Sequence, residues 1–373
     1  MTRRNWRALV LAAALMPTAA LMTTTAQARP VVEVAFVLDT TGSMGPLIEG
    51  AKRKIWSIAT SIVDANPDAQ IRMGLVAYRD IGDEYVTKKF ELTTDIQDLY
   101  ASLLELRAKG GGDWPESVNE ALDVAVNKLA WTSGDEVRRI VFLVGDAPPH
   151  MDYAQDTKYP QTLKVARQKD ILVNAVLAGG ARDTERVWRD VAQQGGGRFI
   201  PIPQDGGDIV IIETPYDEEI IILQERIGRT VLPYGPAPMQ KRAEDKARQV
   251  TSVASAAPAS ASDMASFINK RAKVSGEAVT GDGDLVSDVK SGRKALDAVP
   301  EADLPEDMRK LTVPQRQAKI DAQTSDRKAL NDKLSALVEK RDAFVAEKRK
   351  AAPKPASSFD AAVEATLKAQ IKR

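Results

Sequence analysis

"VVEVAFVLDTTGSMGP", residues 31–46, joins a run of apolar residues to a cluster of polar side chains. The apolar run is typical of a strand that is buried on both faces of a sheet. It ends at Asp39, and the hydroxyl residues Thr40, Thr41 and Ser43 follow directly. Such a cluster can hold a metal ion, form a phosphoenzyme or cap the next helix, and the rest of the chain has to separate these roles.

Apolar strands alternate with amphipathic helices over the first half of the chain. Buried strands are predicted at 31–39, 71–80, 138–147, 171–180 and 198–203, and helices at 46–65, 95–108, 115–130 and 184–194. Residues 84–92 alternate between apolar and polar after a tight turn, which predicts an antiparallel edge strand. The pattern therefore predicts the α/β class, with a doubly wound, mostly parallel sheet covered by helices on both faces.

The pattern changes after residue 205, where a mostly helical C-terminal region is expected. We predict an α/β domain at 29–205, a helix and strap packed on it at 206–235, and a linker with short, partly disordered helices at 236–312. The low-complexity stretch SVASAAPASAS, 252–262, is the core of that linker. A long charged helix at 313–350 is a possible coiled coil, and residues 351–373 are expected to form a flexible tail.

The N-terminal residues have the pattern of an export signal. Arg3, Arg4 and Arg7 precede the apolar stretch ALVLAAALMPTAALM, and AQA at 26–28 offers small residues for cleavage. The alternative is a membrane anchor, but Pro17 leaves the apolar run short for a span of about 20 residues. We therefore expect a signal peptide at 1–28, a bacterial periplasmic or secreted location, and no transmembrane anchor after cleavage.

The composition excludes several kinds of site. The chain has no Cys and a single His, His150, so thiolate metal sites, cysteine nucleophiles and multi-histidine zinc sites are impossible. Any metal in this chain is therefore expected to be bound by oxygen, which favours Mg²⁺, Mn²⁺ or Ca²⁺. Lys+Arg and Asp+Glu are both 52, so net charge indicates no nucleic-acid partner.

The charge is nevertheless distributed unevenly along the chain. Residues 29–235 carry 23 basic and 32 acidic residues, a net of −9, whereas residues 236–373 carry 26 and 20, a net of +6. This difference predicts that the helical region docks on the α/β domain.

Three acidic positions are predicted to meet at one edge of the sheet. Asp39 and Asp146 each end an apolar strand, and ligands of doubly wound sheets bind at the carboxyl ends of the strands. The loop GGGDWPES, 110–117, can reach the same edge, because its three glycines allow close backbone approach and place Asp113 directly after them.

DTTGS, with Asp39, Thr41 and Ser43, resembles the D-x-[ST]-x-S signature of von Willebrand factor type A (vWA) domains, which marks a metal-ion-dependent adhesion site. The resemblance implies a divalent cation, most simply Mg²⁺ and otherwise Mn²⁺ or Ca²⁺, bound directly by the two hydroxyls and through water by the Asp. It further implies that Asp146 supports the cation, and that Asp113 replaces a threonine of the family and makes the site more anionic.

The same resemblance implies binding and not catalysis. The chain is expected to be no enzyme and to bind a protein partner, and the resemblance implies that an acidic residue of that partner completes the metal site. A second hypothesis is a structural scaffold that acts through its C-terminal helical arm.

Two other interpretations of the polar residues remain open at this stage. Thr41 and Ser43 could cap the helix at 46–65, and Asp113 with Glu116 fits a capping box. LDTTGS also resembles the DKTGT motif of P-type ATPases and haloacid-dehalogenase phosphatases, in which Asp39 would be phosphorylated. Thr41, however, stands where those enzymes have their acid/base Asp, which disfavours phosphoryl transfer.

Overall fold

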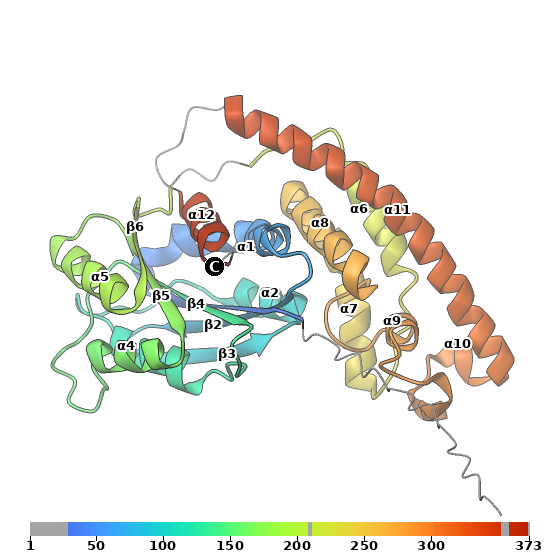
Figure 1. Cartoon of the computed structure of the whole chain (residues 1–373), viewed down its shortest axis with the longest axis horizontal. Helices are drawn as coiled ribbons and strands as arrows, with labels where there is room; N and C mark the ends of the chain where they lie inside the picture. The colour runs from blue at the N-terminus through green and yellow to red at the C-terminus, as the bar shows by residue number, and fades with distance from the viewer. Residues whose placement is uncertain (1–28, 208–210, 352–357, 372–373) are drawn as a thin grey trace, which may run out of the picture.

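The computed structural model describes residues 29–207, 211–351 and 358–371, so the predicted signal peptide lies outside the described residues. Its centre is a six-stranded sheet in the order β3-β2-β1-β4-β5-β6 (Figure 1). The strands are β1 (Val31–Asp39), β2 (Gln70–Tyr78), β3 (Thr87–Thr93), β4 (Val137–Gly145), β5 (Ile171–Ala178) and β6 (Gly196–Ile202). All neighbours are parallel except β3, which pairs antiparallel with β2. The predicted fold class is confirmed, including the antiparallel edge strand.

The strand β1 lies between two parallel neighbours. Asp39 is in register with Tyr78 of β2, and Leu38 is in register with Val144 of β4. The strands β2 and β3 therefore lie on one side of β1, and β4, β5 and β6 lie on the other. Loops diverge at such a switch in strand order and leave a crevice at the carboxyl ends of the strands.

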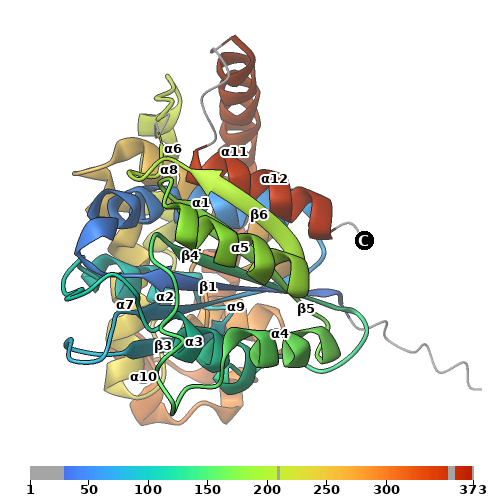
Figure 2. The ribbon, with the colours of Figure 1, turned by 90° about the vertical axis from the view of Figure 1, so that its left-hand side faces the viewer.

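Helices cover both faces of the sheet, as Figure 2 shows. On one face lie α1 (Gly45–Ala65) and α2 (Ile96–Glu105), and on the other lie α3 (Val118–Asp123), α4 (Tyr159–Gln168) and α5 (Arg182–Gln194). The helix predicted at 115–130 begins only at Val118 and ends in a π-helical segment, η2 (Val124–Lys128). Alternate residues of β1 enter the two cores, which is why its sequence is apolar almost throughout.

The region after β6 contains more helix than the sequence predicted. Its elements are α6 (Asp217–Gly228), α7 (Ala237–Ala254), α8 (Pro258–Ser275), α9 (Leu285–Lys290), η3 (Leu296–Ala298), η4 (Glu301–Asp303), α10 (Glu306–Arg309) and α11 (Val313–Ala351). The linker predicted at 252–262 is wrong, because these residues end α7 and begin α8. Ala261 and Ser262 are fully buried there, and Ser260 Oγ donates to the Arg53 carbonyl of α1. Small side chains serve close helix packing in this stretch.

The flexible tail predicted at 351–373 is also wrong for its described part, because residues Phe359–Ile371 form helix α12. This helix packs on α1 and β6 (Figure 1). Asp360 lies 3.1 Å from Lys54 Nζ, and the side-chain amides of Gln370 and Asn174 exchange two hydrogen bonds of 2.8 and 3.0 Å. The end of the chain thus covers the sheet that the first 205 residues form.

The helical region shares its core with the sheet domain. Trp56 of α1 is fully buried, and its ring lies 5.3 Å from that of Tyr100 and 5.5 Å from that of Phe267 of α8. Lys270 of α8 pairs with Asp64 of α1 at 2.8 Å, so the oppositely charged regions are in contact, as their charges predicted. Among the described residues no helix combines the length and apolar character that crossing a bilayer requires.

The helix α6 was predicted to pack on the α/β domain, but its main contacts are with α7, α8 and α11. The long helix α11 begins and ends almost where it was predicted, and it packs on α6, α8 and α9. A coiled coil through α11 stays a prediction.

Buried arginines attach α11 to the helices beneath it. Arg341 Nε lies 2.8 Å from Asp217 Oδ1 of α6, and its Nη2 lies 2.7 Å from Asp263 Oδ1 of α8. Nearer the start of α11, Arg327 pairs with Asp284 at 2.6 Å. A charge-assisted bond of this kind has strict geometry, so these pairs determine how α11 lies on its neighbours.

Replacing Arg341 by Met should lower the free energy of unfolding by about 3–5 kcal/mol, because the buried carboxylate of Asp217 and the partly buried one of Asp263 lose their counter-charge. Lys328→Met is the matched control: Lys328 forms an exposed pair with Asp332 on the same helix, and its loss should change stability by less than about 0.5 kcal/mol. Urea unfolding of both variants measures the difference. Equal effects would show that the buried pairs do not hold α11 in place.

Candidate metal centre

Asp39 is the buried centre of the polar cluster at the end of β1. Its side chain has no exposed surface, and its Oδ1 accepts hydrogen bonds from the Thr41 backbone N–H at 2.8 Å and the Thr41 hydroxyl at 2.7 Å. Its Oδ2 is buried and has no hydrogen-bond partner among the described residues. A buried carboxylate oxygen without a donor is unfavourable, and a cation is the group that most directly satisfies it.

Thr41 and Ser43 face the same cluster and do not cap a helix. The helix that follows starts as a 3₁₀ turn, η1 (Gly42–Met44), and neither this turn nor α1 has a side-chain hydrogen bond at its N-cap. The Thr41 hydroxyl instead lies 3.4 Å from the Ser43 hydroxyl, and Ser43 is exposed. The capping alternative is therefore wrong for both residues, and the site opens to solvent at Ser43.

Asp146 follows β4 and lies at the same sheet edge as Asp39, as predicted. It is 5% exposed, its Oδ2 accepts a 2.6 Å hydrogen bond from Gln204, and its backbone carbonyl accepts one from Thr184. Its negative charge raises the pKa of Asp39. The charges of the two carboxylates therefore interact at the ends of the neighbouring strands β1 and β4.

The glycine loop reaches the site with its backbone. The Gly42 N–H donates to the Gly110 carbonyl at 3.1 Å. Gly111 has φ +83°, and a Cβ there would come within 3.2 Å of both Thr41 Cβ and Glu116 Oε1. Only glycine combines this left-handed conformation with such a close approach, so the loop needs Gly111 to lie against Thr41.

Glu116 is the residue that the sequence reasoning missed. It is 3% exposed, its Oε2 is buried and has no hydrogen-bond partner in the described part of the chain, and its Oε1 lies close to Gly111. Its pattern with Asp113 was interpreted as a capping box, but Ser117 is the N-cap of α3 and no side chain caps that helix. No local pattern in the sequence marks Glu116, because the burial of a loop carboxylate depends on the loops that pack around it.

Burial sets the protonation of these carboxyls. Burial raises the pKa of Asp39 to about 7, although the hydrogen bonds from Thr41 act in the opposite direction. Burial also raises the pKa of Glu116 to about 9, and the carboxylates of Asp39, Asp80, Asp83 and Asp146 add to the rise. Two acids held partly neutral in a crevice are the expected state of a cation site before its cation binds.

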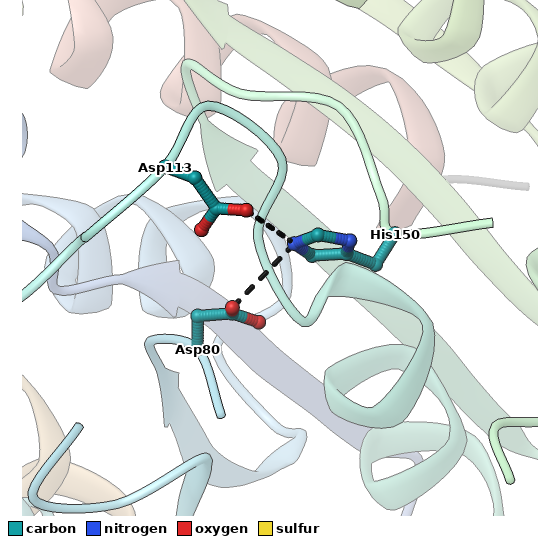
Figure 3. Close-up of side chains that lie close together, drawn as sticks. All are labelled: Asp80, Asp113 and His150. Atoms are coloured by element: carbon teal, nitrogen blue, oxygen red, sulfur yellow. Dashed lines mark ion pairs between the residues drawn. The ribbon is translucent and has the colours of Figure 1, made fainter. Parts of the chain in front are cut away.

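Asp113 is placed differently from the other predicted ligands. Its side chain is 61% exposed, and its Oδ2 lies 3.4 Å from Nε2 of His150 (Figure 3). The Nε2 atom also lies 3.5 Å from Oδ2 of Asp80, which follows β2. Asp113 thus joins a second cluster, while its role as a ligand beside Asp39 stays a prediction. His150 is buried, with 5% of its surface exposed.

Exposed apolar side chains extend from the same loops. Ile81 after β2 is 51% exposed, Trp114 in the glycine loop 48%, and Met151 after β4 50%. The Trp114 indole N–H donates to Asp183 at 2.7 Å, so its ring is held in place at the surface. Large apolar residues that stay exposed near a polar site are typical of a surface that contacts another protein.

Comparison with known proteins agrees with this geometry. The family model of the von Willebrand factor A domain matches residues 33–205. Similar curated proteins include an ariadne-like RING finger protein of Acanthamoeba polyphaga mimivirus, 35% identical over 124 residues, and the alpha-protein kinase vwkA of Dictyostelium discoideum, 28% identical over 120 residues. Each match covers 32% of this chain, but only 11% and 19% of the respective relative. The chain therefore spans a small fraction of the length of the relatives it matches.

A third relative and two solved structures were also found. The von Willebrand factor A domain-containing protein 7 of Rattus norvegicus is 37% identical over 100 residues, which is 26% of this chain and 10% of the relative. Proximal thread matrix protein 1 from the mussel byssus has a TM-score of 0.35 at 16% identity, over 48% of this chain and 43% of its own. The SpRpn10 VWA domain has a TM-score of 0.36 at 14% identity, over 48% and 89%.

The matched residues, the DTTGS cluster at the end of β1 and the strand order of the sheet agree with one another. The match to the von Willebrand factor A domain model covers residues 33–205, and the helical region lies outside it.

Proposed function

We propose that this protein is an exported vWA-domain protein that binds a divalent cation at the end of β1 and, through it, a protein partner. Thr41 and Ser43 supply direct oxygen ligands, and Asp39 and Asp146 supply negative charge beneath them. Glu116 joins this group as a further carboxylate. Mg²⁺ is the proposed cation, because it prefers oxygen ligands and retains waters that an Asp can hold in place. The proposed role is adhesion or assembly without catalysis.

The observation that carries this proposal is a pair of buried carboxylate oxygens, Asp39 Oδ2 and Glu116 Oε2, that have no hydrogen-bond partner among the described residues. Asp39 is hydrogen-bonded to Thr41, and the charge of Asp39 raises the pKa of Glu116, so the two groups interact. Desolvated negative charge with no donor is unfavourable in a folded protein unless a cation compensates it. The residues present therefore fit the cation that the family implies.

The exposed rim favours a protein as the partner. Ile81, Trp114 and Met151 are three of the seven exposed large apolar side chains among the described residues, and they belong to three separate loops at the carboxyl edge of the sheet. An acidic side chain of the partner could complete the coordination while the rim contacts its apolar neighbours.

The other hypotheses have less support. The helical region shares its core with the sheet, so a scaffold function would use a surface of the whole molecule and not a separate arm. Asp39 has no exposed surface, which disfavours its use as a phosphoryl nucleophile. Export rests on the N-terminal sequence, and sequencing the N-terminus of the protein recovered from culture fractions tests it.

Mg²⁺ at 100 times its dissociation constant should stabilise the protein by about 2.7 kcal/mol relative to protein in EDTA. Asp39→Asn should abolish this gain, because the amide keeps the acceptor for Thr41 but loses the charge. Thermal unfolding with and without Mg²⁺ provides the measurement.

The stability of Asp39→Asn in EDTA provides the control. Asp39→Asn removes a buried charge without removing volume, so in EDTA it should be at least as stable as the wild type. An unchanged Mg²⁺ response in this variant would contradict the assignment, and a loss of stability in EDTA would mean that Asp39 is structural.

Stability without metal should fall as the pH rises from about 4 to about 9. Above the ordinary pKa values of 3.8 and 4.5, the unfolded chain releases the protons of Asp39 and Glu116, whereas the folded chain keeps them up to about pH 7 and about pH 9. Between these pH values the folded state binds more protons than the unfolded state. Each additional bound proton lowers the free energy of unfolding by at most about 1.4 kcal/mol for every unit by which the pH rises.

Urea unfolding at a series of pH values in EDTA measures this slope. Saturating Mg²⁺ should remove it, because the cation favours the ionised carboxylates. Glu116→Gln should flatten the metal-free slope above pH 7. A metal-free stability that rises over this range would contradict the buried, protonated state of both groups.

Partner capture should depend on both the cation and the rim. Trp114→Ala should weaken capture in Mg²⁺ at least about tenfold, as expected of an exposed aromatic anchor, and EDTA should release the captured protein. Leu104→Ala is the matched control, since Leu104 is a similarly exposed residue, 38%, on α2. Capture that is insensitive to EDTA and to Trp114→Ala would favour the scaffold hypothesis.

A further inference from the structure

We propose that Asp80, Asp113 and His150 form a second cation site, which takes a transition-metal ion such as Zn²⁺ and is separate from the site at Asp39. One ligand atom from each residue can be chosen so that the three lie within 4.8 Å of one another. They come from three different loops, after β2, in the glycine loop and after β4 (Figure 3). No residue is shared with the DTTGS cluster.

The buried imidazole nitrogen is the observation that points to a ligand. His150 is 5% exposed, and its Nε2 makes no hydrogen bond with any described residue. Figure 3 shows this atom directed between the carboxylates of Asp80 and Asp113. A buried nitrogen facing two acidic groups needs either a proton or a metal ion to be satisfied.

The distances fit a metal better than direct hydrogen bonds. Nε2 lies 3.5 Å from Asp80 Oδ2 and 3.4 Å from Asp113 Oδ2. Two ligands that are each about 2.1 Å from a tetrahedral zinc ion lie about 3.4 Å apart. An ion between these atoms would therefore require only small movements, and Asp113, which is the exposed member, is free to adjust.

The other ring nitrogen fixes the tautomer that a metal requires. His150 Nδ1 lies 2.8 Å from Asp152 Oδ1, so an Nδ1–H donates to this carboxylate and leaves the Nε2 lone pair facing the cluster. A carboxylate behind a histidine ligand is a recurrent arrangement in zinc sites, where it orients the ring and raises its basicity.

Asp80 is oriented in a comparable way. Its Oδ1 accepts a 2.6 Å hydrogen bond from Ser117, and its Oδ2 accepts one of 2.7 Å from Tyr153. The Tyr153 ring also stacks on His150, with ring centroids 3.9 Å apart. Two of the three ligands are thus held rigidly, which lowers the entropy that binding an ion would otherwise lose.

The ligand chemistry separates this site from the first one. One imidazole nitrogen and two carboxylate oxygens suit Zn²⁺ or a similar first-row ion, whereas Mg²⁺ prefers oxygen ligands alone. Three protein ligands leave further positions open, and the exposed side of Asp113 gives access to water. The two sites should therefore be selective for different cations.

The second site also holds the loop that carries Glu116. The Glu116 N–H donates to the Pro148 carbonyl at 2.9 Å, and the His150 N–H donates to the Glu116 carbonyl at 3.1 Å. An ion bound by Asp113 and His150 would fasten the same two loops a second time. The geometry points to a structural ion that keeps Glu116 beside the first site.

The single histidine makes the test direct. Zn²⁺ is titrated into untagged, full-length protein in the presence of excess Mg²⁺, and the imidazole nitrogens are followed by ¹⁵N NMR. We expect stoichiometric Zn²⁺ to shift the Nε2 resonance while Nδ1 stays protonated. An imidazole that does not respond to stoichiometric Zn²⁺ would overturn the proposal.

Variants separate this site from the first one. Asp113→Asn and Asp152→Asn, both at exposed side chains, should weaken Zn²⁺ binding about 10–100-fold in calorimetry. Asp152→Asn, which removes a ligand of neither site, should leave the Mg²⁺-dependent thermal shift measured without Zn²⁺ unchanged. Asp39→Asn should do the reverse, so failure of one site leaves the other measurable. Zn²⁺ binding that Asp39→Asn abolishes and Asp113→Asn does not affect would place the ion at the first site and refute the second.

Discussion

The position of β1 between two parallel neighbours is the constraint on which the rest of the structure depends. Because helices cover both faces of the sheet, the side chains of β1 are apolar except for Glu33, which pairs with Arg72, and a polar cluster follows only where the strand ends. That end is Asp39, with Asp80 after β2 on one side and Asp146 after β4 on the other. Parallel pairing therefore brings three carboxylates from distant parts of the sequence to one edge.

This edge is held in a state that favours cations. Within the described residues, Asp39 and Glu116 each keep a buried oxygen, and His150 a buried nitrogen, that has no hydrogen-bond partner. Backbone hydrogen bonds join the loops that carry these groups. Burying these polar groups is unfavourable. The sheet tolerates a few of them because its two hydrophobic cores stabilise it.

The helical region is part of the same folded body. Trp56 of α1 contacts α2 and α8, and α12 from the end of the chain packs on the other side of α1. The helix that carries the metal loop at its start is thus buried by elements separated from it by more than 190 residues. The helices α8 and α12 therefore help to hold α1, which begins two residues after Ser43.

The sequence by itself determined the sheet, its antiparallel edge strand and the convergence of Asp39, Thr41, Ser43 and Asp146, because these follow from local periodicity and from where apolar runs stop. Only the tertiary structure decided the rest. Ala and Ser at 252–262 have no strong pattern, so close packing on α1 and not composition makes them helical. Glu116, Asp80 and His150 became site residues only when three loops met, since no local pattern tells a buried loop side chain from an exposed one.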